Sequence, residues 1–200
     1  DEDPITGQAF MYLFRSDQDK KGLWSEPEPL GNTVCTEHNE GSACFDSNGK
    51  TLFFTRCMEM DGSNLACDIY FAKKQGNGFG ASMALGLVNR DENDSSQVGH
   101  PALSPDDEFL IFSSDLPGGF GGKDLWYVKA EEGSFAGAVP ENLGASINTQ
   151  VTRCSRRFGT TAICTGPPTA ATVWARWTFG RLKSERASWR LPSPRCYLSH

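Results

Sequence analysis

The residues with the clearest chemical pattern are two cysteines, Cys57 and Cys67, which flank a nine-residue segment, 58–66. Cys57 follows the apolar run 52–55, and Cys67 immediately precedes the run 68–73. Both runs are expected to be strands, and adjacent antiparallel strands would bring the two sulfurs within bonding distance if the side chains face each other. We therefore predict a disulfide, which in an oxidising compartment would stabilise the loop by roughly 2–4 kcal/mol.

The other candidate ligands give weaker signals. Cys35 and Cys44 either pair with each other or remain free. No Cys-x-x-Cys pair exists and the histidines are scattered, which disfavours a zinc site. The acidic loops 61–64 and 91–95 lack the full EF-hand spacing and its closing Glu, so solvated turns are favoured over calcium sites. The glycine-rich stretch 117–123 lacks the Gly-Lys-Ser/Thr ending of a phosphate loop. We predict no metal and no cofactor.

Catalysis has one candidate pattern, the segment 46–52, which faintly resembles the Asp-box of sialidases. A sialidase needs several arginines around the substrate carboxylate, but the arginines before residue 150 are Arg15, Arg56 and Arg90, in unrelated contexts. No Gly-x-Ser-x-Gly elbow occurs, and His38 and His100 each stand alone beside turns. We predict no catalytic residues and no enzymatic activity. A propeller glycoside hydrolase of the sialidase type is the alternative, and no ligand-binding residues are assigned.

The elements that would position these residues are short strands. The runs 52–55 and 109–112 are too brief for helices, and the turn signals 46–50 and 104–107 precede them. No helical period persists before residue 150. The sequence therefore predicts an all-β fold, with the aromatic side chains as core at positions 45, 53, 54, 70, 71, 109, 112, 126 and 127.

These strands belong to an internal repeat. Residues 45–55 align with 103–113 at an offset of 58, and 68–73 align with 124–129 after a loop two residues different in length. A Leu-Gly pair closes each copy, at 85–86 and 143–144, and 11–14 with 30–31 form an earlier, partial copy. Repeats of this length built from antiparallel strands are typical of propeller blades.

The segments 100–107, 110–115 and 121–126 resemble the WD40-like β-propeller repeat of Tol-type periplasmic proteins. The sequence of these segments most resembles the repeat in Bacteroidetes OmpA-like envelope lipoproteins, including those associated with type IX secretion. The resemblance covers residues 5–150 and implies a partial β-propeller, an incomplete ring of about two blades plus part of a third. Such an open ring leaves strand edges exposed, so we expect the chain alone to aggregate or stay partly unfolded.

The resemblance also implies a function and a location. A member of this family would be periplasmic, associated with the outer membrane, and would act as a non-catalytic scaffold. Its partners would be proteins, or glycans, of an envelope or secretion complex, and a peptidoglycan-binding OmpA-like domain would lie downstream. No apolar run is long enough to cross a bilayer, so we expect no transmembrane segment.

Charge divides the chain at residue 150. The formal charge is −14 over residues 1–150 and +8 over the arginine-rich residues 151–200, giving −6 in total. A basic tail can indicate nucleic-acid binding, with salt-dependent affinity. The acidic body argues against that partner, and the tail has a simpler explanation in the genetic code.

Residues 151–200 have the character of the next blade translated in the wrong frame. Dropping two bases from the Val151 codon allows the following codons to encode Asp-Glu-Met-Phe-Pro, which is common in the family's blades. In this frame Trp174-Ala175 must encode Gly and Trp177-Thr178 must encode Asp. Their spacing is that of Gly121 and Asp124. We therefore hypothesise a frameshifted C-terminal tail that was not selected to pack and is disordered.

Overall fold

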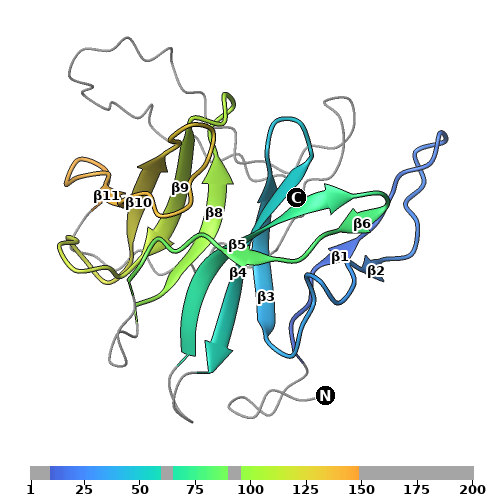
Figure 1. Ribbon diagram of the computed structural model, residues 1–200, viewed down its shortest axis with the longest axis horizontal. Coiled ribbons are helices and arrows are strands. Elements are labelled where there is room, and N and C mark those ends of the chain that lie inside the picture. The colour runs from blue at the N-terminus through green and yellow to red at the C-terminus, as the bar shows by residue number, and fades with distance from the viewer. Residues whose placement is uncertain (1–9, 60–64, 90–95, 149–200) are drawn as a thin grey trace, which may run out of the picture.

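The chain forms an all-β structure in a computed structural model that describes residues 10–59, 65–89 and 96–148. The described residues contain eleven strands and no helix, arranged as two antiparallel sheets and one short strand pair (Figure 1). The all-β prediction is confirmed. The predictions for the loops 61–64 and 91–95 and for the tail 151–200 concern residues outside these ranges.

The central sheet contains the first repeat copy. Its strand order is β3-β4-β5-β6, and β7 pairs with β5 beyond that path. The bounds of its strands are β3 Asn39–Phe45, β4 Thr51–Glu59, β5 Leu65–Gln75, β6 Gly78–Phe79 and β7 Met83–Ala84. Gly49 adopts a φ of 65° in the turn between β3 and β4. An Asn-Gly turn favours such a tight reversal because glycine has no Cβ to oppose a positive φ.

The second sheet contains the second copy, in the order β8-β9-β10-β11. Its strands are β8 Val98–Leu103, β9 Phe109–Ser114, β10 Asp124–Lys129 and β11 Glu141–Asn142. Strand β9 contains the predicted run 109–112 and extends it by two residues. Asp107 occupies the turn position equivalent to Gly49 and also has a positive φ, of 57°. Asp tolerates this conformation better than most residues, so the same turn forms without glycine.

The two sheets repeat the same strand register. Phe53 pairs with Phe71 in the central sheet, and their counterparts Ile111 and Tyr127 pair in the second sheet. The outer strands follow the same rule, because β7 pairs with β5 as β11 pairs with β10. The sequence repeat is therefore also a repeat of backbone hydrogen bonding.

A third copy of the outer strands lies near the N-terminus. Strands β1 (Phe14–Arg15) and β2 (Glu28–Pro29) form an antiparallel pair beside the central sheet (Figure 1). All three copies share one backbone hydrogen bond, in which the N–H of the leucine in the Leu-Gly pair donates to a carbonyl in or next to the strand that pairs with the outer strand: Leu30 to Leu13, Leu85 to Ile69 and Leu143 to Leu125. The partial copy predicted from 11–14 and 30–31 thus has the outer-strand geometry of the two complete copies.

Apolar side chains fill both sides of the central sheet. Phe53 and Ile69 point to the second sheet, where they join a cluster with Val98, Leu110 and Phe112. On the opposite side, the N-terminal segment completes a second cluster, which consists of Leu13, Val34, Leu52, Phe54 and Ala72. Each junction therefore buries one apolar face of the central sheet, which would be unfavourable if it were exposed to water.

The predicted aromatic core is only partly buried. Phe53, Phe54, Phe112 and Trp126 are buried. The remaining positions are half-buried at the strand surfaces: Phe45, Tyr70, Phe71, Phe109 and Tyr127. Tyr127 donates its hydroxyl hydrogen to Glu141 Oε2 at 2.7 Å. The described residues form no closed ring of sheets.

Candidate functional site: the junction between the two sheets

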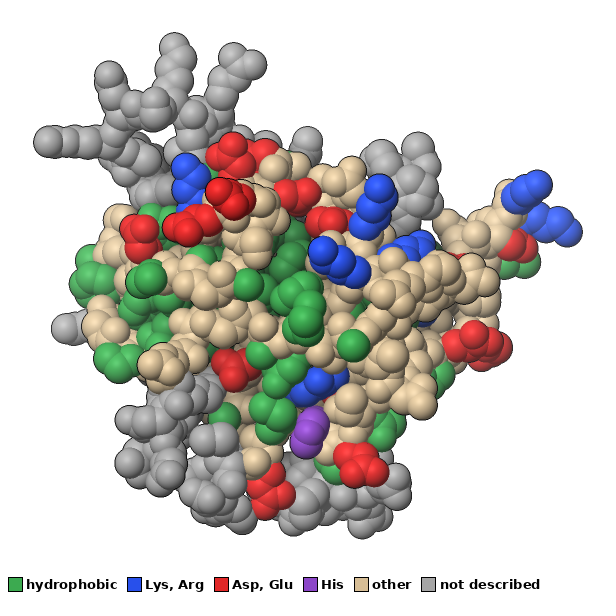
Figure 2. Space-filling model, in the orientation of Figure 1, with side chains coloured by type: hydrophobic (Ala, Val, Ile, Leu, Met, Phe, Trp, Pro, Cys, Tyr) green, Lys and Arg blue, Asp and Glu red, His purple; other side chains and the backbone are tan. Residues whose placement is uncertain are grey.

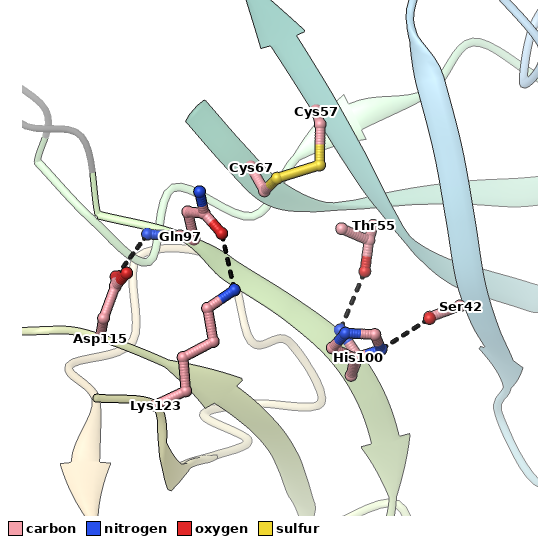
Figure 3. The surroundings of a disulfide bond; sticks show 8 residues. All are labelled: Ser42, Thr55, Cys57, Cys67, Gln97, His100, Asp115 and Lys123. Carbon is pink, nitrogen blue, oxygen red and sulfur yellow. Dashed lines mark hydrogen bonds between the residues drawn. A yellow bond between two sulfur atoms is a disulfide. The ribbon is translucent and has the colours of Figure 1, made fainter. Parts of the chain in front are cut away.

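A disulfide lies at one end of the junction. Strand β4 places Cys57 directly opposite Cys67 of β5, with a Cα–Cα distance of 4.0 Å, and the two sulfurs are bonded (Figure 3). The pair lies on the same side of β4 as Thr55, because side chains two residues apart along a strand share a face. The bond therefore joins β4 and β5 on the face that meets the second sheet.

Gln97 connects this disulfide region to the second sheet. Its backbone forms a parallel bridge with Cys67. The Gln97 N–H donates to Asp115 Oδ1 at 2.6 Å, and Lys123 Nζ donates to Gln97 Oε1 at 2.6 Å (Figure 3). These bonds come from both ends of the β9–β10 connection. Gln97 thus fixes the start of β8 against both sheets.

Two backbone bulges meet at the centre of the junction. Ser42 of β3 and His100 of β8 stand at equivalent positions of the repeat, and both have a positive φ, 41° and 58°. Ser42 Oγ lies 2.7 Å from His100 Nδ1, so the two bulges are hydrogen-bonded to each other (Figure 3). Non-glycine residues in this backbone region cost about 1–3 kcal/mol each, so the surrounding contacts must hold them there.

Thr55 supplies one of those contacts. Its hydroxyl accepts a hydrogen bond from the His100 N–H at 2.9 Å. A Cβ placed on Gly99 would lie 2.9 Å from Thr55 Cγ2, so only glycine lets β8 approach β4 this closely. Burial and the nearby Lys123 ammonium lower the pKa of His100 below its usual value. The imidazole is therefore neutral at pH 7, with Nδ1 either accepting from Ser42 or donating to it according to the tautomer.

The opposite face of β4 holds a buried ion pair that the sequence did not reveal. Arg56 Nε donates to Glu40 Oε1 at 3.0 Å, and Arg56 Nη2 donates to the Val34 carbonyl at 2.8 Å. The guanidinium also lies 4.5 Å from the centre of the Tyr70 ring. Thr36 Oγ1 donates to the same carboxylate at 2.6 Å. The available signal was a pair of opposite charges, Glu40 and Arg56, 16 residues apart on either side of the predicted turn 46–50.

This arrangement bears on the sialidase alternative. Arg56 is committed to Glu40 inside the structure and does not point to solvent. Arg15 forms a surface ion pair with Asp17, which raises the pKa of Arg15 and lowers that of Asp17. Arg90 lies outside the described residues. The two described arginines are therefore not gathered around a common substrate position.

The other end of the junction is an acidic groove. It has a volume of about 450 Å³ and lies between the β3–β4 turn and the β8–β9 turn. Phe53, Phe135 and Leu103 contribute to its lining, and its acidic residues are Asp46, Asp106, Asp107 and Glu108. Lys129 is the one basic residue in the lining. Figure 2 shows acidic side chains gathered over this part of the surface, beside apolar side chains. We call this feature the acidic groove.

The carboxylates hold the turns around the acidic groove. Asp107 accepts from the Ser47 N–H at 3.0 Å and from Ser47 Oγ at 2.6 Å, which joins the two turns. Asp106 accepts from Ser104 Oγ at 2.5 Å and from the Glu108 N–H at 3.2 Å. These hydrogen bonds lower the pKa of Asp106, so it remains ionised well into the acidic range.

The remaining candidate residues, the two other cysteines and the glycine-rich loop, make contacts that stabilise the fold. Cys35 and Cys44 are half-buried and are not joined by a disulfide, and Cys35 Sγ donates to the Leu13 carbonyl. The buried carboxylate of Asp124, the first residue of β10, accepts from the Phe120 N–H of the glycine-rich loop and from Asn142 Nδ2. Within the described residues, no three His, Cys, Asp or Glu side chains are grouped as metal ligands. The same part of the chain contains no helix with the length and apolar character needed to span a membrane.

Comparison with known proteins identified no related sequence. Neither a protein-family model nor a curated protein sequence matches the chain. The class of protein therefore rests on the repeat itself and on the contacts at the two junctions.

Proposed function

We propose that this chain is part of a WD40-like β-propeller that acts as a non-catalytic binding scaffold in the bacterial periplasm. In this proposal it works at the outer membrane, within an envelope or secretion complex of the OmpA-like lipoprotein type. Partners bind the loops and turns at the blade edges, and no covalent bond is made or broken.

One observation carries the propeller part of the proposal: the junction between successive copies is repeated. Cys67 of the central copy pairs with Gln97 at the start of β8. At the corresponding place, the Met11 carbonyl of the N-terminal copy accepts from the N–H of Glu40 at 2.9 Å, and Glu40 follows Asn39, the repeat counterpart of Gln97. Copies joined at corresponding places are expected where one rotation relates each copy to the next. Repetition of a rotation around an axis is how propellers are built.

The acidic groove supports the binding part. It lies between turns of two successive copies, where surfaces of propellers are most variable. Pockets of about 300–1,000 Å³ are of the size that holds a ligand or an anchoring side chain, and the acidic groove falls in this range. A disulfide at the other end of the junction is consistent with an oxidising compartment such as the periplasm.

The propeller is tested on the gene with its frame restored after the Gln150 codon. We expect the corrected protein to form a closed ring of blades within one chain, whose structure shows further copies with the β8–β11 register. Sequencing of the organism's mRNA is the first control. An intact single frame that encodes residues 151–200 as printed would remove the frameshift hypothesis.

The scaffold role is tested separately, with fractionated cells and purified sacculi. We expect the corrected protein in the outer-membrane fraction and expect it to cosediment with peptidoglycan only when the downstream region is present. Fluorogenic sialosides test the hydrolase alternative. Turnover that copurifies with the protein would contradict the non-catalytic role, and a cytoplasmic location would contradict the envelope role.

A further inference from the structure

A rigid hairpin projects between β1 and β2. Asp19 N–H donates to the Leu23 carbonyl at 2.8 Å, and the Gly22 N–H donates back to the Asp19 carbonyl at 3.0 Å. The Asp19 carboxylate also accepts from the Lys21 and Leu23 N–H groups, at 2.8 and 2.9 Å. These bonds fix the conformation of residues 17–25, which we call the hairpin tip. Figure 1 shows it extending from the side of the molecule away from the second sheet.

The hairpin tip presents apolar and basic side chains to solvent. Leu23 is 66% exposed and Trp24 is 52% exposed. Lys20 and Lys21 are exposed beside them. The tip also contains two carboxylates. Asp17 forms an ion pair with Arg15, and Asp19 accepts from the Lys21 and Leu23 N–H groups. Neither Lys20 nor Lys21 forms an ion pair within the described residues. Preorganised aromatic side chains on a projecting element are typical anchors of protein interfaces.

The acidic groove has the complementary character. Phe53, Phe135 and Leu103 contribute apolar lining, while Asp106, Asp107 and Glu108 provide negative charge at the turn. Asp106 and Glu108 are exposed. Lys20 and Lys21 therefore match the acidic side chains of the groove, and the exposed Leu23 and Trp24 match its apolar lining. The two surfaces lie on different parts of one chain (Figures 1 and 2).

We propose that the hairpin tip of one copy of this chain docks into the acidic groove of a second copy. Trp24 and Leu23 cover the apolar lining, while Lys20 and Lys21 pair with Asp106 and Glu108. The interface is heterologous, because different patches meet, so a pair of copies keeps one free tip and one free groove. Association then continues head to tail and forms an open chain or a ring. This proposal goes beyond the scaffold role and does not depend on it.

The test is sedimentation velocity of the complete 200-residue chain over a range of concentrations, at low and high salt. The tip variant is Lys20→Glu/Lys21→Glu. The groove variant is Asn48→Lys/Glu108→Lys, which leaves the bonded Asp106 and Asp107 in place. The control variant Glu37→Lys/Glu59→Lys reverses two exposed charges, one just before β3 and one at the end of β4, at the disulfide end of the central sheet. Circular dichroism establishes that each variant is folded.

We expect the wild type to self-associate and high salt to weaken this association, because the charges are exposed. Tip and groove variants should each associate at least about tenfold more weakly, while the control variant matches the wild type. An equimolar mixture of tip and groove variants should form pairs again, since the unaltered tip of the groove variant then meets the unaltered groove of the tip variant. Trp24→Ala should weaken association without lowering stability.

Several results would overturn the proposal. A wild type that stays monomeric at every concentration, or variants that associate as well as the wild type, would do so. A mixture that fails to recover association would also refute tip-in-groove pairing. Aggregation through exposed strand edges would leave the association of all three charge-reversal variants unchanged. If the hairpin tip instead docks to a different partner, the wild type would stay monomeric.

Discussion

The two faces of the central sheet are closed in different ways. Strand β4 sends Phe53 and Thr55 toward the second sheet, and it sends Phe54 and Arg56 toward the N-terminal segment. The second-sheet face is held by a large apolar cluster, with neutral hydrogen bonds around His100. The N-terminal face combines a smaller apolar cluster with the buried pair Glu40–Arg56.

The difference shows that one repeat can use two chemistries at equivalent junctions. The repeat counterparts of Glu40 and Arg56 are Val98 and Ser114, so the ion pair occurs at the N-terminal junction and not at the second. A buried ion pair contributes little net stability, because desolvation offsets the attraction. It does, however, require a neighbour that satisfies it, here the Val34 carbonyl. The N-terminal junction therefore depends more on polar complementarity than the second one does.

The largest expected effect is at this ion pair. Glu40→Ala leaves the Arg56 guanidinium buried without its carboxylate, so we expect the free energy of unfolding to fall by about 3–5 kcal/mol. Urea denaturation measures the loss. The control is the double variant Glu40→Met/Arg56→Met, which removes both charges and should lose much less. A single variant as stable as the double variant would contradict the polar dependence of this face.

The disulfide on the opposite face should have the next largest effect. Replacing Cys57 and Cys67 with serine frees the loop between β4 and β5, so we expect a loss of roughly 2–4 kcal/mol. Urea denaturation of the wild type with and without reductant provides the comparison. The reduced wild type should match the double serine variant. Reductant that leaves the unfolding midpoint unchanged would show that the bond does not stabilise this face.

A smaller effect is expected at Thr55. Thr55→Val removes the acceptor of the His100 N–H and keeps the side-chain shape, which should cost about 1–2 kcal/mol. Thr55→Ser retains the hydroxyl. After subtraction of the cost of the lost methyl group, its free energy of unfolding should lie within a few tenths of a kcal/mol of the wild-type value. Thermal unfolding distinguishes them. Equal losses in both variants would assign the effect to packing and not to the hydrogen bond.

The smallest effect is the pH dependence of His100. Because the pKa of His100 is lowered in the folded chain, the unfolded chain binds the proton more readily. The contribution to stability is thus present above the unfolded pKa near 6.5 and is lost as the pH falls below it. We expect the unfolding midpoint of the wild type to fall more between pH 7.5 and 5 than that of His100→Gln. Identical pH profiles would contradict this assignment.

Much of the fold could be predicted because it depends on local signals. The apolar runs 52–55 and 109–112 lie within β4 and β9, and the Leu-Gly pairs mark the same backbone hydrogen bond in three copies. Alternation and turn residues act over a few positions, so they are visible in one sequence. The closeness of Cys57 and Cys67 followed from the same logic, since a short loop between adjacent strands limits their separation.

The acidic groove could not be predicted, because it brings together turns far apart in the sequence. The burial of the ion pair could not be predicted either, because it depends on the N-terminal segment that covers this face. Asp107 reaches Ser47 across 60 residues, and this contact sets one wall of the acidic groove. Nothing in either turn alone indicates which other turn it will meet. The segment 46–52 resembled an Asp-box, yet its Asp46 accepts from the Lys50 N–H and holds a β-turn.

By itself, then, the sequence determined the strands, their repeat and the division of charge at residue 150, because these depend on composition and on spacing along the chain. Only the tertiary structure decided what the side chains do. It placed His100 against Ser42 through two positive-φ bulges and enclosed Arg56 with Glu40. It also left Trp24 exposed on a projecting hairpin. The physical reason is that burial and hydrogen-bond partners are set by the packing of one sheet on another, which no single strand specifies.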